Sequence, residues 1–239
     1  MKVEQSEKYN IVSFIKNTSS GMFSCACRYC YIVLGILNNC CFFVLKITGI
    51  ILLKIIFRIK AENKDKIPRT GPLIVAPNHF SYLDPIALQA VFPRRISFMM
   101  TEQFYEGRMK WLFKLLHCIC VREKENGINI TALREGLEVL KKNGVLGIFP
   151  EGEVSRVGCL QEGIQGVGFL AKKSGAPVIP VFISGTYEAL PKGKILPKPH
   201  RIEVIFGNPV SFDQTKKTTK EEIGYITRKI MEEIKKLSA

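Results

Sequence analysis

The stretch Leu73-Ile-Val-Ala-Pro-Asn-His-Phe-Ser-Tyr-Leu-Asp-Pro85 carries the most structural information in this chain. It opens with an apolar run, passes through a turn that contains His79 and Asp84, and reaches Pro85, where a helix is expected to begin. A short, uninterrupted apolar run is typical of a strand buried in a parallel sheet. The stretch therefore predicts a strand, a polar turn and a helix in succession.

The same alternation continues along the chain. Buried strands are expected at residues 73–76, 96–100, 119–121, 145–149 and 178–183, with a further strand at 202–206. Helical patterns occupy residues 85–91, 104–116, 128–142 and 163–173, and a charged terminal helix is expected at 220–237. In the helix at 128–142 the expected apolar face consists of Ile130, Leu133, Leu137 and Leu140. Alternating strands and helices predict an α/β fold, a mostly parallel sheet covered by helices.

Polar motifs follow three of these strands. His79 comes after the first, Arg122 ends the third, and Glu151-Gly152 follows the fourth. Function in open α/β sheets gathers beyond the carboxyl ends of the strands, so these motifs are expected at one edge. No clustered His or Asp suggests a metal site, and none is expected.

His79 and Asp84 have the chemistry needed to deprotonate a hydroxyl. An imidazole is a general base near neutral pH, and a carboxylate selects its tautomer and stabilises its charged form. The two residues would meet across a turn, because their spacing does not place them on one helix face. The alternative is that Asp84 only caps the helix and His79 is an ordinary loop histidine.

Four motifs in a fixed order separate these readings: Asn78-His-Phe-Ser-Tyr-Leu-Asp84, Val121-Arg122, Phe149-Pro-Glu-Gly152 and Val178-Ile-Pro-Val-Phe-Ile-Ser-Gly-Thr-Tyr187. Together they resemble the glycerolipid acyltransferase family typified by 1-acylglycerol-3-phosphate acyltransferase. The resemblance covers about residues 55 to 210, and four ordered motifs are far more specific than one.

The resemblance implies that a lysophospholipid hydroxyl attacks an acyl thioester, with His79 as general base and Asp84 orienting it. It also implies direct transfer without an acyl-serine intermediate, so Ser81 is expected to be a loop residue. No cofactor is expected. Acyl-CoA or acyl-ACP serves as co-substrate, and in the second case acyl carrier protein is a partner.

The acceptor is expected to contact Arg122, Glu151, Gly152, Ser155 and Arg156. Arginine suits a phosphate bidentately, and glycine permits close backbone approach. Because a carboxylate cannot hold a phosphate, Glu151 is expected to accept from a glycerol hydroxyl or to orient Arg122. For Arg122 the alternative is a surface ion pair with Glu123 or Glu125.

Three departures from the family pattern concern basic groups. Thr101, Val154 and Glu162 stand where the family commonly carries Lys, Arg and Lys, respectively. Arg156, Arg94 or Lys124 could supply the missing charge for the acceptor phosphate. Otherwise the acceptor carries less negative charge than lysophosphatidate, for example another lysolipid. Glycerol 3-phosphate is a further alternative, and a non-catalytic lipid-binding protein is the rival from a different class.

The charge balance points to an anionic partner. The 239 residues include 35 Lys and Arg against 21 Asp and Glu, a formal net charge of +14. No zinc-finger spacing, RNA-binding aromatic signature or basic-region helix is present, so nucleic acid is not expected. The basic residues cluster around apolar segments instead, which favours an anionic membrane surface.

The eight cysteines do not form a disulfide framework, and a reduced, cytoplasmic face fits best. A zinc cluster at Cys25-x-Cys27-x-x-Cys30 is a weaker alternative.

The amino-terminal region is the most apolar. Tyr29 to Leu45 carries no charge but is interrupted by Asn38-Asn39, and the following residues to Phe57 include Lys46 and Lys54. One basic face on an apolar helix is typical of a helix lying in the membrane interface. We therefore expect an amino-terminal tail and membrane-embedded helical hairpin over residues 1–62, joined through a basic linker at 60–69 to an acyltransferase domain over 63–239. A spanning helix with snorkelling lysines is the alternative.

Overall fold

The computed structural model describes residues 55–105, 118–121, 130–194, 196–214 and 218–238. By its internal contacts the chain divides into Met1–Ile51 and Leu52–Ala239, and every described element belongs to the second unit. The predicted membrane hairpin and the Cys25–Cys30 cluster lie outside the described residues, apart from the last residues of the hairpin.

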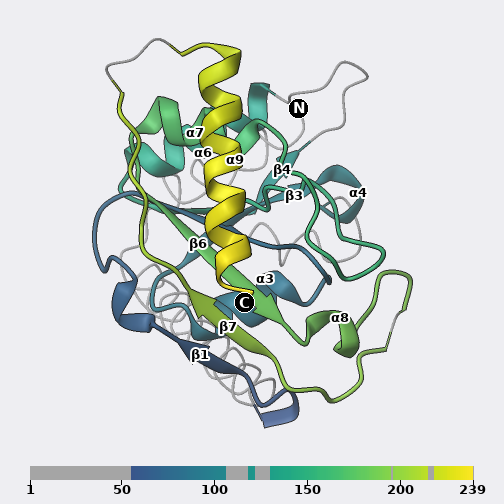
Figure 1. Ribbon diagram of the computed structural model, residues 1–239. Helices are drawn as coiled ribbons and strands as arrows, with labels where there is room; N and C mark the ends of the chain where they lie inside the picture. Colours follow the sequence, from purple (N-terminus) through teal and green to yellow (C-terminus); the bar gives the residue numbers. More distant parts are fainter. Residues whose placement is uncertain (1–54, 106–117, 122–129, 195, 215–217, 239) are drawn as a thin grey trace, which may run out of the picture. The chain divides into compact units, whose positions relative to one another are not determined.

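The described residues form a seven-stranded sheet in the order β1-β7-β6-β2-β5-β3-β4 (Figure 1). Its strands are β1 (Lys60–Glu62), β2 (Leu73–Pro77), β3 (Ile96–Thr101), β4 (Ile119–Val121), β5 (Val145–Gly147), β6 (Val178–Ser184) and β7 (Glu203–Phe206). Neighbouring strands are parallel except β6 and β7, which pair antiparallel from Val181↔Phe206 to Ser184↔Glu203. The predicted α/β class with a mostly parallel sheet is confirmed.

The central strand β2 is buried on both faces. Leu73 and Val75 belong to one apolar cluster, and Ile74 and Ala76 belong to the other, because successive side chains of a strand point to opposite faces. All four side chains are fully buried. A strand between two apolar layers must be apolar throughout, and this is why residues 73–76 read as a continuous hydrophobic run.

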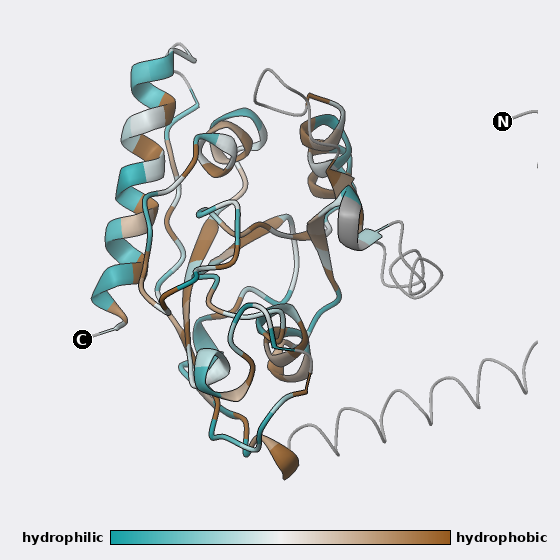
Figure 2. Ribbon diagram, turned by 90° about the vertical axis from the view of Figure 1, so that its right-hand side faces the viewer, coloured by the Kyte–Doolittle hydropathy of each residue, from teal (hydrophilic) through white to brown (hydrophobic). Residues whose placement is uncertain are grey.

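Helices cover both faces of the sheet. Helix α3 (Asp84–Val91) contributes Ala87, Leu88 and Val91 to the first cluster. Helices α6 (Ile130–Lys141), α7 (Gly166–Ser174) and α9 (Lys220–Lys236) contribute to the second. Helix α9 presents mostly hydrophilic residues on its outer side (Figure 2), while Ile226, Ile230 and Ile234 are buried. The remaining short elements are η1 (Lys64–Lys66), α4 (Glu102–Tyr105) and α8 (Thr186–Ala189).

Most predicted elements appear within a few residues of their expected bounds. Of the helix expected at 104–116, only the first residues are described, within α4. The face expected for α6 needs correction: Ile130 is 63% exposed, while Ala132, Leu133, Gly136 and Leu140 are buried. Ile130 occupies the first helical position, ahead of the part of the helix that packs on the sheet.

Residues 60–69 do not form the simple linker that their composition suggested. Strand β1 pairs with β7, and Phe57 is buried in the first cluster although it was expected to end a membrane helix. Strand β1 lies on the amino-terminal side of the expected domain division between residues 62 and 63, which stays a prediction. Within the described part of the chain, no helix has the length and apolar character needed to cross a membrane.

Candidate active site

His79 and Asp84 meet across the turn between β2 and α3. The His79 Nδ1 atom lies 2.9 Å from Asp84 Oδ2, and the same oxygen accepts hydrogen bonds from the backbone N–H groups of Phe80 at 2.7 Å and Ser81 at 2.8 Å. Asp84 is fully buried, and its other oxygen, Oδ1, has no hydrogen-bond partner among the described residues. The Asp84 carboxylate therefore has two roles: it closes the turn through the two backbone N–H groups, and it holds the imidazole of His79.

This geometry selects the tautomer of the imidazole. A carboxylate oxygen accepts at Nδ1, so Nδ1 carries the proton and Nε2 keeps the lone pair that a general base needs. The His79 ring also stacks on Phe149, with ring centroids 3.8 Å apart and an interplanar angle of 20°. Contact with Asp84 at one edge and Phe149 on one face leaves the ring little rotational freedom.

The backbone of His79 is held by the loop that follows β5. Its N–H donates to Glu151 Oε1 at 2.7 Å, and its carbonyl accepts from the backbone N–H of Ser155 at 2.8 Å. The Glu151 Oε2 atom accepts from the backbone N–H of Gln161 at 3.1 Å. Glu151 thus positions His79, and its expected contact with the acceptor stays a prediction.

Burial changes the acidity of Glu151. The side chain is almost inaccessible to solvent, and desolvation of the carboxylate raises its pKa to about 7, against the lowering effect of the two backbone N–H groups. The buried Asp84 carboxylate nearby raises the pKa further. Glu151 is therefore a carboxyl group that changes its protonation near neutral pH while hydrogen-bonded to the backbone of His79.

Two further hydrogen-bonded links tie the dyad turn to β6 and its continuation. The Asn78 side chain donates to the carbonyl of Ile183 at 2.9 Å and accepts from its N–H at 2.6 Å. The buried Ser81 hydroxyl donates to the carbonyl of Leu190 at 2.7 Å. Ser81 is therefore part of the framework, in agreement with its expected place as a loop residue.

A tight turn carries Gly152. Its N–H donates to the carbonyl of Phe149 at 3.1 Å, and its φ of 78° lies in the left-handed region that favours glycine. A Cβ at this position would lie 2.8 Å from Ile164 Cδ1. Gly152 thus shapes the turn that presents Glu151 to His79.

The other residues expected to contact the acceptor have different surroundings. The buried Ser155 hydroxyl donates to the carbonyl of Cys159 at 3.0 Å and accepts from two backbone N–H groups of the same loop, so it organises that loop. Its contact with substrate stays a prediction. Arg156 is exposed and forms no ion pair with any described residue. Arg122 and Lys124 lie outside the described residues.

Arg94, the third basic residue expected as a possible partner of the acceptor phosphate, lies elsewhere. The Arg94 guanidinium donates to the carbonyls of Pro68, Gly71 and Asn143, which precede β2 and β5. It therefore lies at the amino ends of the strands, opposite the dyad, and the suggestion that it serves the acceptor is wrong.

Lys192 is a residue that the sequence pattern did not single out. Its Nζ donates to the carbonyl of Val154 at 3.1 Å and to Glu153 Oε2 at 3.2 Å. A cation thus reaches the very loop in which the family's arginine is replaced by the buried Val154. Only the tertiary contact could reveal it, because 38 residues separate Lys192 from Val154.

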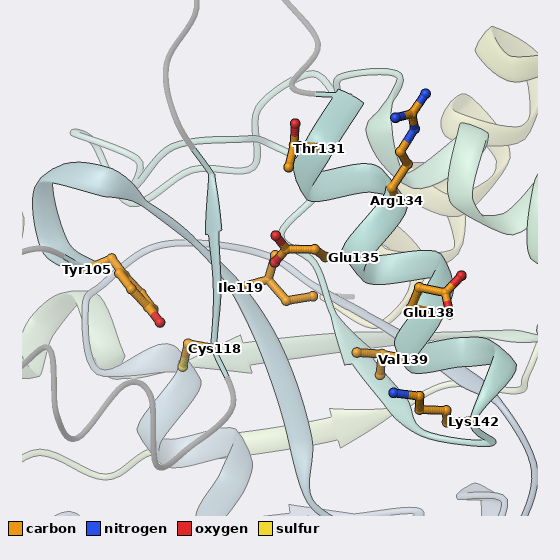
Figure 3. Close-up of a pocket in the computed structure, with 9 residues that line it drawn as sticks. All are labelled: Tyr105, Cys118, Ile119, Thr131, Arg134, Glu135, Glu138, Val139 and Lys142. Atoms are coloured by element: carbon orange, nitrogen blue, oxygen red, sulfur yellow. The ribbon is translucent and has the colours of Figure 1, made fainter. Parts of the chain in front are cut away.

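A pocket of about 500 Å³ lies between β4 and α6 (Figure 3). Its lining includes Ile119 of β4 and the preceding Cys118, Arg134 and Glu138 of α6, and Tyr105 at the end of α4. None of the residues around the dyad lines it, so this pocket is separate from the candidate active site. Among the described residues, no group of His, Cys, Asp or Glu could hold a metal ion.

Comparisons with known proteins agree with this geometry. The Acyltransferase family model matches residues 58–184. The 1-acyl-sn-glycerol-3-phosphate acyltransferase of Streptococcus pneumoniae is 29% identical over 181 residues, which are 74% of this chain and 64% of that protein. The chloroplastic 1-acyl-sn-glycerol-3-phosphate acyltransferase LPAT1 of Arabidopsis thaliana is 25% identical over 152 residues, 63% of this chain and 43% of that protein.

A solved structure is similar as well. The crystal structure of the 1-acyl-sn-glycerophosphate acyltransferase PlsC from Thermotoga maritima matches with a TM-score of 0.61 and 28% sequence identity, over 76% of this chain and 72% of that one. The chain spans 43% to 64% of the length of the two curated relatives described above.

Proposed function

The chain belongs to the Acyltransferase family, and from this premise we propose that it moves a fatty acyl group from a thioester to the free hydroxyl of 1-acylglycerol 3-phosphate, giving phosphatidate. One observation carries the proposal: the hydrogen bond of 2.9 Å between His79 Nδ1 and the buried Asp84. It leaves Nε2 as the basic nitrogen at the carboxyl end of β2, where substrates of open α/β sheets bind.

The reaction follows from that tautomer. His79 Nε2 takes the proton of the acceptor hydroxyl while the hydroxyl oxygen attacks the thioester carbonyl carbon. The tetrahedral intermediate collapses with cleavage of the carbon–sulfur bond, and the imidazolium returns its proton to the leaving thiolate. Asp84 stabilises the imidazolium, and Phe149 presents a ring face to it, which also favours a cation. No acyl-enzyme is required.

The acceptor phosphate calls for cations near the dyad. Arg122 is the residue indicated by the family motifs, Arg156 is a candidate to replace the arginine that Val154 displaces, and Lys192 adds an ammonium group at the Val154 carbonyl. Glu151 and Gly152 shape the loop that leads to Val154. Because Val154 is buried and apolar, an acceptor with less negative charge is the alternative, with the same chemistry at the hydroxyl.

The donor is proposed to be acyl-CoA or acyl-ACP, and the site is proposed to work at a membrane surface. Both donors are anionic and suit the net charge of +14. The lysophospholipid itself resides in a bilayer, so the protein must reach it there. The predicted amino-terminal hairpin would supply the anchor on the cytoplasmic face.

The test is acyl transfer from a labelled thioester to a panel of lysolipids and glycerol 3-phosphate, comparing the wild type with His79→Gln. Glutamine retains an amide that can donate to Asp84 but cannot accept the proton at neutral pH. We expect transfer to 1-acylglycerol 3-phosphate to fall by about 10²–10⁴-fold in the variant. Thermal unfolding of both proteins controls for folding.

Different results would change the proposal in different ways. Undiminished transfer by a folded His79→Gln variant would remove the general-base mechanism. Transfer confined to another acceptor would retain the dyad and replace the substrate. No transfer from either donor to any acceptor, by folded wild-type protein, would favour a non-catalytic lipid-binding protein.

A further inference from the structure

The segment Pro191–Arg201 has an unusual combination of charge and exposed apolar surface. It contains Lys192, Lys194, Lys198 and Arg201 and no acidic residue. Leu196 is 81% exposed, more than any other large apolar side chain among the described residues. Lys194 and Lys198 are exposed and form no ion pair with described residues, whereas Arg201 pairs with Glu203. We call this segment the 191–201 loop; Ile195 lies outside the described residues.

The 191–201 loop adjoins the candidate active site. It follows α8 at the carboxyl end of β6, on the lower right of Figure 1. The residue just ahead of it, Leu190, accepts the hydrogen bond from Ser81 in the dyad turn. Lys192 contacts Glu153 and Val154, the residues after the Glu151-Gly152 turn. The 191–201 loop is thus attached to the dyad turn, next to Leu190, and to the loop after β5, through Lys192.

A second exposed loop lies beside it. In residues 153–159, Val157 is 68% exposed, and Arg156 is exposed without an ion pair among described residues. The Tyr187 hydroxyl of α8 donates to the Arg156 carbonyl at 3.2 Å, which joins this second loop to the base of the first. Two neighbouring loops therefore each present an exposed apolar side chain, Leu196 between Lys194 and Lys198 in the first and Val157 next to Arg156 in the second.

We propose that the 191–201 loop and the 153–159 loop together dock on an anionic phospholipid bilayer, with Leu196 and Val157 entering the interface and Lys194 and Lys198 contacting lipid headgroups. The choice of a bilayer as partner rests on the proposed function, which requires access to a membrane-resident lysolipid. Docking here would bring the dyad directly to the surface in which that acceptor lies.

The physical pattern fits a lipid surface. Interfacial elements bury apolar side chains at the boundary between headgroups and acyl chains, while Lys and Arg next to them attract anionic lipids. Lysine stems can also extend along the apolar zone with the charge kept in water. The acidic groups here are few: Glu153 is paired with Lys192, and Glu188 of α8 is exposed. An acidic protein would use the cations but has no need of isolated, protruding aliphatic tips.

The test places a tryptophan at the loop tip of the full chain. Leu196→Trp is compared with Tyr225→Trp, which replaces an exposed aromatic residue in α9, a helix that begins at the top of Figure 1, away from α8. Wild-type emission is subtracted to remove the native Trp111. Each protein is mixed with phosphatidylglycerol–phosphatidylcholine vesicles whose acyl chains are dibrominated, because bromine quenches tryptophan only at short range. Thermal unfolding of each variant checks the fold.

We expect the Leu196→Trp emission to shift to the blue and fall about two-fold, since interfacial side chains reach about 5–10 Å into the bilayer boundary. The Tyr225→Trp emission should stay unquenched even though the same protein is bound through its other parts. Phosphatidylcholine vesicles alone, or Lys194→Glu with Lys198→Glu in the Leu196→Trp protein, should abolish most of the quenching.

Equal quenching at both positions, or none at Leu196→Trp, would overturn the proposal. So would a shift of Leu196→Trp emission on addition of acyl carrier protein with no response to vesicles, which would assign the surface to a protein partner. The readout requires no catalysis. An inactive protein that still shows loop-specific quenching would therefore contradict the proposed acyl transfer and leave the docking surface intact.

Discussion

At the scale of single residues, Glu151 combines a positioning contact with an unusual acidity. Its two oxygens accept from the backbone N–H groups of His79 and Gln161, so it links the turn that carries His79 to the loop after β5. Burial raises its pKa to about 7. The folded protein therefore retains this proton at pH values where the unfolded chain, with a pKa of 4.5, has lost it.

The pH dependence of stability follows from that difference. Because the folded-state pKa is raised, the contribution of Glu151 is fully present below about pH 4.5 and is lost as the pH rises through about 7. Glu151→Gln removes this titration. It also lowers the free energy of unfolding by an amount that does not depend on pH, because the side-chain amide N–H₂ group would face the Gln161 N–H. Relative to the wild type, we expect the variant to gain up to about 3 kcal/mol in free energy of unfolding between pH 4.5 and pH 8.

Urea unfolding of both proteins across that pH range measures the difference. A free-energy difference between variant and wild type that does not change with pH would show that Glu151 has an ordinary acidity in the folded protein. The same samples, assayed for acyl transfer, would report whether the His79 backbone contact survives in the variant.

At the scale of elements, the layer that covers one face of the sheet depends on a close contact between α7 and α9. A Cβ on Gly168 would collide with the backbone carbonyl oxygen of Ile223 and lie 2.5 Å from Thr227 Oγ1. Thr227 already donates to that carbonyl at 2.9 Å. The helices can approach this closely only because Gly168 has no side chain.

Gly168→Ala should therefore separate the two helices and lower the free energy of unfolding by about 1–3 kcal/mol, although alanine is the better helix former. Gly166→Ala, in the first position of the same helix, is the matched control, because its nearest neighbour would be Ile148 Cδ1 at 3.6 Å. Denaturant unfolding of both variants makes the comparison. Equal effects at the two positions would show that helix propensity, and not the contact with α9, controls this layer.

At the scale of the whole described unit, the sheet begins ahead of residue 63, where the acyltransferase domain was expected to start. Strand β1 pairs with β7, the Ile202 N–H donates to the Phe57 carbonyl, and the Lys60 N–H donates to the Ile202 carbonyl. Phe57 is only 3% exposed. Residues 57–62 therefore complete both the hydrogen bonding of β7 and one apolar cluster.

Two truncations distinguish this structural role from that of a linker. Deletion of residues 1–54 retains Phe57 and β1, whereas deletion of residues 1–62 removes both and leaves β7 as an unprotected edge. Loss of a buried Phe costs about 3–5 kcal/mol, so we expect the shorter protein to unfold about 10 °C lower. Identical midpoints in a thermal unfolding experiment would instead support a division at residue 62.

The parts of this protein that sequence alone could predict are those that depend on local patterns. The apolar runs of β2, β5 and β6 are continuous because these strands are largely buried on both faces, and the motif spacing places His79 and Asp84 on either side of one turn. Strand β1 was not predicted, because it lies at the sheet edge and has a single apolar residue between Lys60 and Glu62, which is too short an apolar run to indicate a strand.

Other features were decided only by the tertiary structure, since they depend on residues far apart in the chain. The contact of Glu151 with the His79 N–H, the approach of Lys192 to Val154, and the use of Arg94 at the opposite ends of the strands each join segments from different strand–helix units. A charged side chain has the same local signature whether it meets a substrate or a backbone carbonyl. The sequence by itself therefore determined the fold class and the pairing of His79 with Asp84, while the packing of the loops decided what holds that pair in place.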